Sequence, residues 1–319
     1  MRFPDPQLSA FRRLATLALR HLPHTHPAYR ILWSSTVCHT DWFVFLDDLE
    51  YRFHPAGCGN RFCPSCARDW SDDLRSRLTP VATSIRPRRL RHLVLTVVSA
   101  PSGKLSEYLS QMMTCFRLWK DAGRRGTTRS RTNDAIKTNA FLKPVSGITS
   151  KIEVTWSEKG WHPHLHCLLD ASRFDCEKGD PARETWTTIT GNHMAKPATV
   201  VDVRRCDDNI AASAECAKYC MKPFSPKQFT PERLAELCVA TFHRRLTASS
   251  GTLHIPTLPD HSHGCEYIGT IRALANIYSS THSGKLERNV AHAALRAFQR
   301  RYSSNPDAVA GLPDYILNM

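Results

Sequence analysis

Three cysteines within a short segment constrain this chain more than any other feature. Cys58, Cys63 and Cys66 lie in Cys-Gly-Asn-Arg-Phe-Cys-Pro-Ser-Cys, where the CxxC pair can place two thiolates on one metal ion and the preceding cysteine adds a third. Such a compact cluster indicates bound metal rather than a disulfide framework. Structural zinc takes four nitrogen or sulfur ligands in a tetrahedron, so one further ligand is needed.

The remaining zinc ligand must come from outside the cluster. Cys38 is favoured because segment 42–51 can form a hairpin between it and the cluster, and His39 and His54 are the alternatives. A site closed by protein ligands leaves no position for a substrate. The zinc is therefore expected to be structural, and to stabilise a segment with little apolar surface of its own.

The charge balance favours an acidic partner. The 43 Lys and Arg residues exceed the 29 Asp and Glu residues, which gives a formal net charge of +14. A hydrophobic content of 41% excludes a disordered tail or a collagen-like repeat. No apolar run reaches the length of a membrane span and no secretory signal is visible, so we expect a cytoplasmic protein that binds nucleic acid and no membrane.

The order of predicted elements indicates an α+β fold with an antiparallel sheet and flanking helices. Leu90 to Val98 predicts a buried strand. Apolar and polar residues alternate in segments 148–156 and 162–170, and a turn at Glu158 to Gly160 lies between them, so these segments predict a hairpin. Three regions are expected: a helical and zinc-binding region at 1–87, a central domain at 88–224 and a mainly helical region at 225–319.

A basic loop is expected after the helix at 104–122. It contains Arg124, Arg125, Arg129 and Arg131 with few acidic residues to oppose them. In a chain of this charge, contact with phosphates is at least as reasonable an interpretation as a solvated loop.

Two histidines on the predicted hairpin form a candidate metal site. His164 and His166 are two residues apart, so on a strand they share a face. Glu153 on the preceding strand can point to the same side and supply a third ligand, and His162 competes with it for that role. Two imidazoles and a carboxylate suit Mn²⁺ or Mg²⁺ and leave positions for a phosphate oxygen.

A second group of reactive side chains lies on the next predicted helix. Glu215, Tyr219 and Lys222 are spaced to share one helical face, which aligns a base, a hydroxyl and a cation. Taken alone, this pattern is also typical of an exposed helix with a half-buried tyrosine.

These motifs and their order resemble those of the HUH superfamily of rolling-circle replication initiators. The sequence contains Leu95-Thr96, then Glu153-Val154-Thr155 and His162-Pro163-His164-Leu165-His166, then Lys218-Tyr219-x-x-Lys222. The chain is most similar to plasmid Rep proteins with one catalytic tyrosine, which have a cysteine cluster before the first motif and a glutamate four residues before the tyrosine. The resemblance covers about residues 38 to 222.

The resemblance implies a role for each matching residue. His164 and His166 would bind the catalytic ion, Tyr219 would be the nucleophile that nicks single-stranded or hairpin origin DNA, and Lys222 its accompanying cation. Glu215 would activate water in the hydrolysis that ends the cycle. A host helicase and a host DNA polymerase are the implied partners.

Two other classes of protein remain as alternatives. An HUH transposase with a cysteine-rich N-terminal segment would use the same histidines and tyrosine for strand transfer. A zinc-containing DNA-binding repressor would bind a specific sequence without nicking it.

Overall fold

A computed structural model describes most of the chain, in two compact units. The described residues are 6–47, 50–129, 135–174, 180–194, 196–218, 229–256, 266–280 and 282–302. Unit 1 combines Met1–Cys66 with Thr257–Met319, and unit 2 is Ala67–Pro256. Among the described helices, none is long and apolar enough to cross a bilayer.

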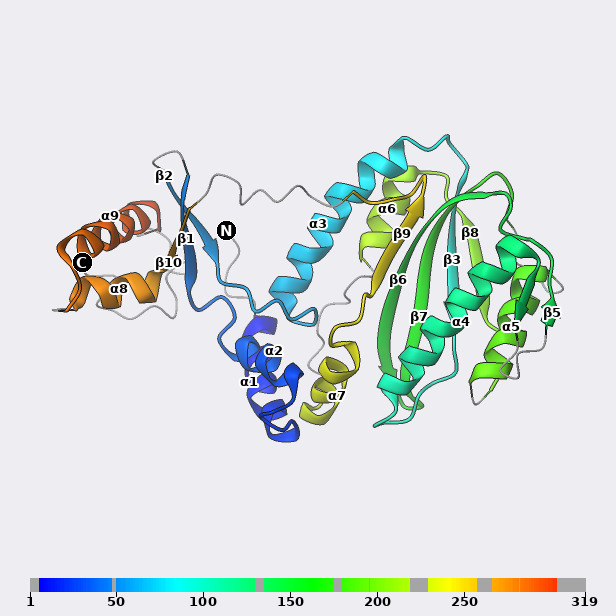
Figure 1. The fold of residues 1–319 in the computed structure, drawn as a ribbon, viewed down its shortest axis with the longest axis horizontal. Helices are drawn as coiled ribbons and strands as arrows, with labels where there is room; N and C mark the ends of the chain where they lie inside the picture. Colours follow the sequence, from blue (N-terminus) through cyan, green and yellow to red (C-terminus); the bar gives the residue numbers. More distant parts are fainter. Residues whose placement is uncertain are drawn as a thin grey trace. The chain divides into compact units, whose positions relative to one another are not determined.

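Unit 2 is built around a five-stranded antiparallel sheet with the order β8-β3-β7-β6-β9 (Figure 1). The strands are β3 (Leu90–Thr96), β6 (Val145–Ser157), β7 (Gly160–Ala171), β8 (Val201–Arg205) and β9 (Thr247–Gly251). The long hairpin of β6 and β7 occupies the middle, as the alternating sequence predicts. A small separate hairpin consists of β4 (Thr127–Arg129) and β5 (Ala135–Lys137).

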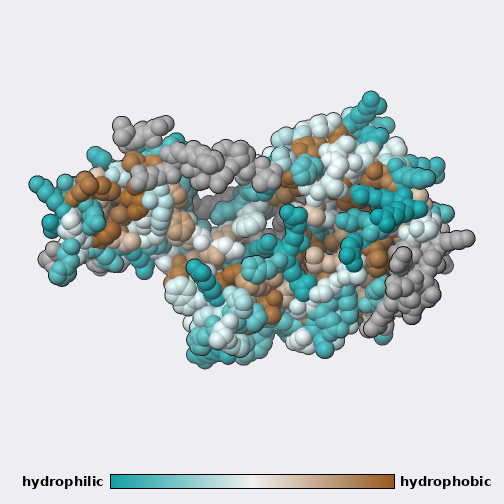
Figure 2. Space-filling view, in the orientation of Figure 1, coloured by the Kyte–Doolittle hydropathy of each residue, from teal (hydrophilic) through white to brown (hydrophobic). Residues whose placement is uncertain are grey.

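Helices cover both faces of this sheet. The helices of unit 2 are α3 (Pro64–Thr83, whose first residues belong to unit 1), α4 (Leu105–Arg125), α5 (Pro181–His193), α6 (Asn209–Lys218) and α7 (Pro231–Thr241). Helices α4 and α5 lie against one face (Figure 1), and over α4 the surface is a mixture of hydrophilic and apolar residues (Figure 2). On the other face, α3 and α6 pack through Leu78 and Cys216 in one apolar cluster with Leu90 and Leu168.

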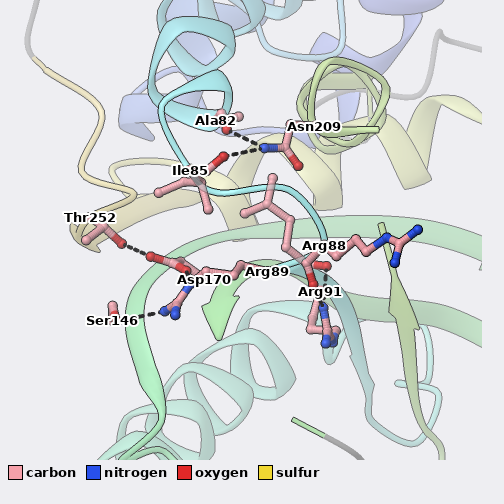
Figure 3. Close-up of polar contacts among 10 residues, drawn as sticks. Ala82, Ile85, Arg88, Arg89, Arg91, Ser146, Asp170, Asn209 and Thr252 are labelled. Carbon is pink, nitrogen blue, oxygen red and sulfur yellow. Dashed lines mark hydrogen bonds and ion pairs between the residues drawn. The ribbon is translucent and has the colours of Figure 1, made fainter. Parts of the chain in front are cut away.

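A buried carboxylate joins several elements at one corner of the sheet (Figure 3). Asp170, near the end of β7, accepts hydrogen bonds from Arg89 Nε at 2.6 Å and from Thr252 Oγ1 at 2.7 Å. Arg89 also donates to Ser146 Oγ of β6 at 3.2 Å. The start of β3, both central strands and the turn after β9 are thereby held together.

Unit 1 contains a second antiparallel sheet, of order β10-β1-β2, and its own core. Its elements are α1 (Pro6–Ala18), a 3-10 turn (Leu19–His21), α2 (Pro27–Thr36), β1 (Trp42–Asp47), β2 (Glu50–Pro55), β10 (Glu266–Thr270), α8 (Ile271–Ser279) and α9 (Lys285–Tyr302). The predicted hairpin at 42–51 is present as β1 and β2. Trp42 packs on Phe298 and Tyr302 of α9, with ring centroids 5.6 and 4.9 Å apart.

Several elements differ from the sequence-based expectation. The polar composition of segment 171–197 predicts an insertion, but the segment contains α5, which buries Trp186 and Ile189. Within the mainly helical region expected at 225–319, Glu266–Thr270 is instead the strand β10, because it pairs with β1, and the Thr270 side chain then caps α8. The compact units also divide the chain elsewhere than at the expected boundaries of 87 and 224, since both chain ends share unit 1.

Replacing Asp170 by alanine should reduce the free energy of unfolding by about 3 kcal/mol, because the Arg89 guanidinium would lose its buried partner. Urea unfolding followed by tryptophan fluorescence measures this change. Asp207→Ala is the matched control: Asp207 pairs with Arg205 at 3.0 Å on the exposed surface, and such pairs contribute about 0.5 kcal/mol. Equal effects of the two substitutions would contradict the structural role of Asp170.

Candidate functional site

The central hairpin brings the predicted metal-binding residues to one face of the sheet. In the β6 and β7 pairing Glu153 lies opposite His164 and Lys151 opposite His166. Directly paired residues of antiparallel strands point to the same side, so all four side chains share a face. This is the face on which α6 packs, because Cys216 and Ala217 join Leu168 in the apolar cluster.

His166 is the most closely surrounded member of this group. Its Nε2 lies 2.7 Å from Glu153 Oε2, and both side chains are buried. Its Nδ1 lies 3.3 Å from Nε2 of His92 on β3, and the two imidazoles stack with an interplanar angle of 11°. His166 is therefore held on both ring nitrogens, by a carboxylate and by a second imidazole.

His92 is a neutral partner for His166 at neutral pH. Burial, and after it the neighbouring His166, lower the pKa of His92 to about 4, while Glu215 acts in the opposite direction. A neutral His92 can accept the Nδ1 proton of His166, in which case the lone pair of His166 Nε2 faces the Glu153 carboxylate and the two groups could bind a cation together. Ligand atoms at about 2.1 Å from an octahedral ion are about 3.0 Å apart, close to the observed spacing of 2.7 Å.

His164 lies further from this pair and contacts His162. Its ring centroid is 4.2 Å from that of His162 and 6.2 Å from that of His166. His164 and His166 nevertheless stand on the same face of β7, because they are two residues apart on one strand. Of the two candidates for a third ligand, Glu153 contacts His166 and His162 contacts His164.

The helix predicted to contain the catalytic group is present as α6, which the structure describes up to Lys218. Glu215 is half-buried and close enough to His92 to influence its charge. The carbonyls of Cys216 and Ala217 accept hydrogen bonds from Lys151 Nζ at 3.0 and 2.9 Å. Tyr219 and Lys222 lie outside the described residues.

The thiols of Cys38, Cys58, Cys63 and Cys66 form one cluster in unit 1, with ligand atoms all within 4.8 Å of one another. Among the described residues this is the only such group of three or more potential ligands. Sulfur distances of 3.5 Å (Cys38 to Cys63), 3.6 Å (Cys38 to Cys66) and 3.7 Å (Cys58 to Cys66) approach the value of about 3.8 Å for a tetrahedron with Zn–S bonds of about 2.3 Å.

The four thiols interact strongly, and their pKa values shift in opposite directions: those of Cys38 and Cys63 are raised, and those of Cys58 and Cys66 are lowered. Hydrogen bonds from the neighbouring thiols of Cys38, Cys58 and Cys63 hold the pKa of Cys66 well below its usual range, and His39 acts in the same direction. The backbone N–H of Cys58 donates to Cys38 Sγ at 3.4 Å. His54 instead lies on β2, with its ring 5.7 Å from that of Phe45. The four cysteines can therefore hold a metal ion such as zinc.

The sequence model of a family described as "Replication protein" matches residues 52–263. The chain belongs to this replication protein family. The matched range contains Cys58, Cys63 and Cys66, the whole β6 and β7 hairpin and α6, whereas Cys38 precedes it. No curated protein and no solved structure matches the chain.

The predicted phosphate-binding arginines of this replication protein lie around the end of α4. Arg124 and Arg125 are exposed in its last turn rather than in a loop, where their charge also suits the negative end of the helix dipole. Gly126, with φ +74°, ends the helix. Arg129 lies in β4, and Arg131 falls outside the described residues.

Two residues of the replication protein's sheet face escaped the sequence analysis. Lys151 is two residues before Glu153, so alternation along one strand places both on the same face. His92 is two residues before Val94, and only the pairing of Val94 with His166 shows that His92 shares this face. The alternation around His92 is a weak signal, because Arg91 beside it is also polar.

The purified replication protein should contain about one zinc ion per chain. Cys63→Ser should remove the zinc, because only three of the four thiolate ligands of the tetrahedral site then remain. Metal analysis after gel filtration measures the zinc content. Loss of zinc should also speed tryptic cleavage after Arg61, since the segment depends on the ion for its structure. Cys115→Ser, on buried Cys115 of α4, should keep the zinc. Full zinc retention in Cys63→Ser would exclude the cluster as the site.

Proposed function

We propose that this replication protein is a rolling-circle initiator of the HUH type, from a plasmid or a phage, which nicks single-stranded or hairpin DNA at its origin. The observation that carries the proposal is the His166 and Glu153 contact on the face where α6 ends, within the range matched by the replication protein family. The family match favours initiation of replication over transposition or repression.

His164, His166 and Glu153 are the proposed ligands of a catalytic Mn²⁺ or Mg²⁺ ion. When bound, the ion would polarise the scissile phosphodiester and stabilise negative charge on its oxygens. His92 would keep the His166 ring in the tautomer and orientation that binding through Nε2 requires, through the 3.3 Å contact with Nδ1.

Tyr219 is the proposed nucleophile. Its reference pKa is near 10, so the phenol must lose its proton as it attacks, and the charge of Lys222 favours that loss. The Oη atom would form a bond to phosphorus while the bond from phosphorus to the 3′ oxygen breaks. The products are a 5′-phosphotyrosine and a 3′-OH, which takes up a proton and primes synthesis by a host DNA polymerase.

Glu215 is the proposed general base for the second half of the cycle. It would remove a proton from a water molecule that attacks the phosphotyrosine, which restores Tyr219 and releases a 5′-phosphate. The arginines near the end of α4 would supply phosphate contacts, and a host helicase would open the duplex. The thiol cluster suits a reducing, cytoplasmic location.

Tyr219→Phe should reduce covalent protein–DNA adduct to background, because the substituted ring has no oxygen to attack phosphorus. The assay incubates the protein with labelled single strands and hairpins of its own origin and Mn²⁺, with EDTA as a control, and resolves adducts by denaturing electrophoresis. Tyr108→Phe is the matched control on α4 and should keep activity. An adduct formed by Tyr219→Phe would refute the nucleophile assignment.

Glu215→Ala should keep the first cleavage but slow hydrolysis of the adduct by at least about 100-fold, the usual contribution of a general base. Pre-formed adduct is diluted into unlabelled DNA, and the release of labelled 5′-phosphate is followed over time. If cleavage and hydrolysis fall by the same factor, Glu215 does not act specifically in termination.

A further inference from the structure

A buried lysine fixes the end of α6. Lys151 on β6 is only 1% exposed, yet its side chain ends in an ammonium group. Its Nζ donates to the carbonyl oxygens of Cys216 at 3.0 Å and Ala217 at 2.9 Å. The carbonyl groups of a helix point toward its carboxyl end, which carries the negative end of the helix dipole, so these oxygens are favourable partners for a buried cation.

The same helix end is held from a second side. Ser71 Oγ of α3 donates to the carbonyl of Ala217 at 3.1 Å. The Ala217 oxygen therefore accepts one hydrogen bond from the sheet and one from a packed helix. Both donors belong to unit 2, so the contacts lie within one compact body.

Lys151 connects this helix end to the candidate metal site through a single strand. It stands two residues before Glu153 on β6 and directly opposite His166 in the β6 and β7 pairing. A strand within a sheet keeps such neighbours at nearly constant separation. The contact of Lys151 with Cys216 and Ala217 thus ties these residues to the paired strands β6 and β7, which carry Glu153 and His166.

We propose that Lys151 is a positioning residue for the nucleophile of the DNA cleavage reaction, acting by fixing the end of α6 beside the histidine strand. The proposal rests on the proposed function, since it takes Tyr219, two residues after Ala217 in the sequence, as the attacking group. Two residues of chain reach at most about 7 Å, so movement of Ala217 shifts the start of the tyrosine segment.

The test compares substitutions that separate positioning from charge and from stability. Lys151→Met keeps the unbranched apolar stem and removes the donor, whereas Lys151→Arg and Lys151→Gln keep donors with and without charge. Ser71→Ala removes the other hydrogen bond to the Ala217 carbonyl without altering any charge. Lys120→Met is the matched control: Lys120 is a partly buried lysine of α4, packed over the Phe116 ring.

Three quantities are measured. They are the single-turnover rate of adduct formation at saturating oligonucleotide, the dissociation constant for the oligonucleotide, and the dissociation constant for Mn²⁺, which electron paramagnetic resonance follows. Lys151→Met should slow the rate about 100-fold, the cost of a small misplacement of reacting groups, with both binding constants within about 2-fold of wild type. Lys151→Arg should recover most of the rate and Lys151→Gln part of it. Ser71→Ala should slow it about 5-fold, as expected for one neutral hydrogen bond.

Three results would overturn the proposal. The first is a Lys151→Met rate within 3-fold of wild type, and the second is a parallel loss of Mn²⁺ binding, which would assign Lys151 to the metal site. The third is a rate of adduct formation that is unchanged in Ser71→Ala, together with a rate in Lys151→Gln as low as in Lys151→Met. That combination would indicate a role for the charge alone.

Failure of the proposed function is visible separately, because wild type would then form no adduct with any origin strand. In that case amide hydrogen exchange still decides whether Lys151 fixes the helix end. Exchange in α6 should be faster in Lys151→Met than in wild type and unchanged in Lys120→Met. Equal exchange in all three proteins would overturn the proposal independently of cleavage.

Discussion

The register between β6 and β7 is the constraint on which the candidate active site depends. It sets Glu153 opposite His164 and Lys151 opposite His166, so that potential metal ligands and the contact to α6 share one face. A shift of β6 by one residue would turn Lys151 and Glu153 toward the opposite, apolar face, away from His164 and His166. Because β3 and β9 flank this hairpin within the sheet, the site stands on a rigid support rather than on a loop.

The same face of the sheet buries an unusual number of polar groups. Glu153 and His166 contact each other, Lys151 contacts the end of α6, and Asp170 at the far end of β7 binds Arg89 and Thr252. Each group would be destabilising if buried without a partner. The contacts of the candidate site therefore also contribute to the stability of unit 2.

The elements that the sequence predicted well are those with strong local periodicity. The β6 and β7 hairpin alternates along its whole length, and α4 has a continuous apolar stripe. Helix α5 was missed because threonines make up much of its buried side, and β10 because its pairing partner β1 lies near the other end of the chain. Pairing across such a separation leaves no signal in a short window of sequence.

The sequence alone indicated that Cys58, Cys63 and Cys66 lie close together, that His164 and His166 share a face and that Glu215 lies on a helix. Local spacing is sufficient for these predictions, because the geometry of a turn, a strand or a helix relates residues that are close in the sequence. The sequence favoured Cys38 over His39 and His54, and the tertiary structure places its thiol in the cluster. The tertiary structure alone showed that His92 stacks on His166 and that Lys151 contacts the end of α6. These contacts depend on strand register and helix packing. Both result from the burial of apolar side chains that come from all parts of a unit, so no short stretch of sequence reveals them.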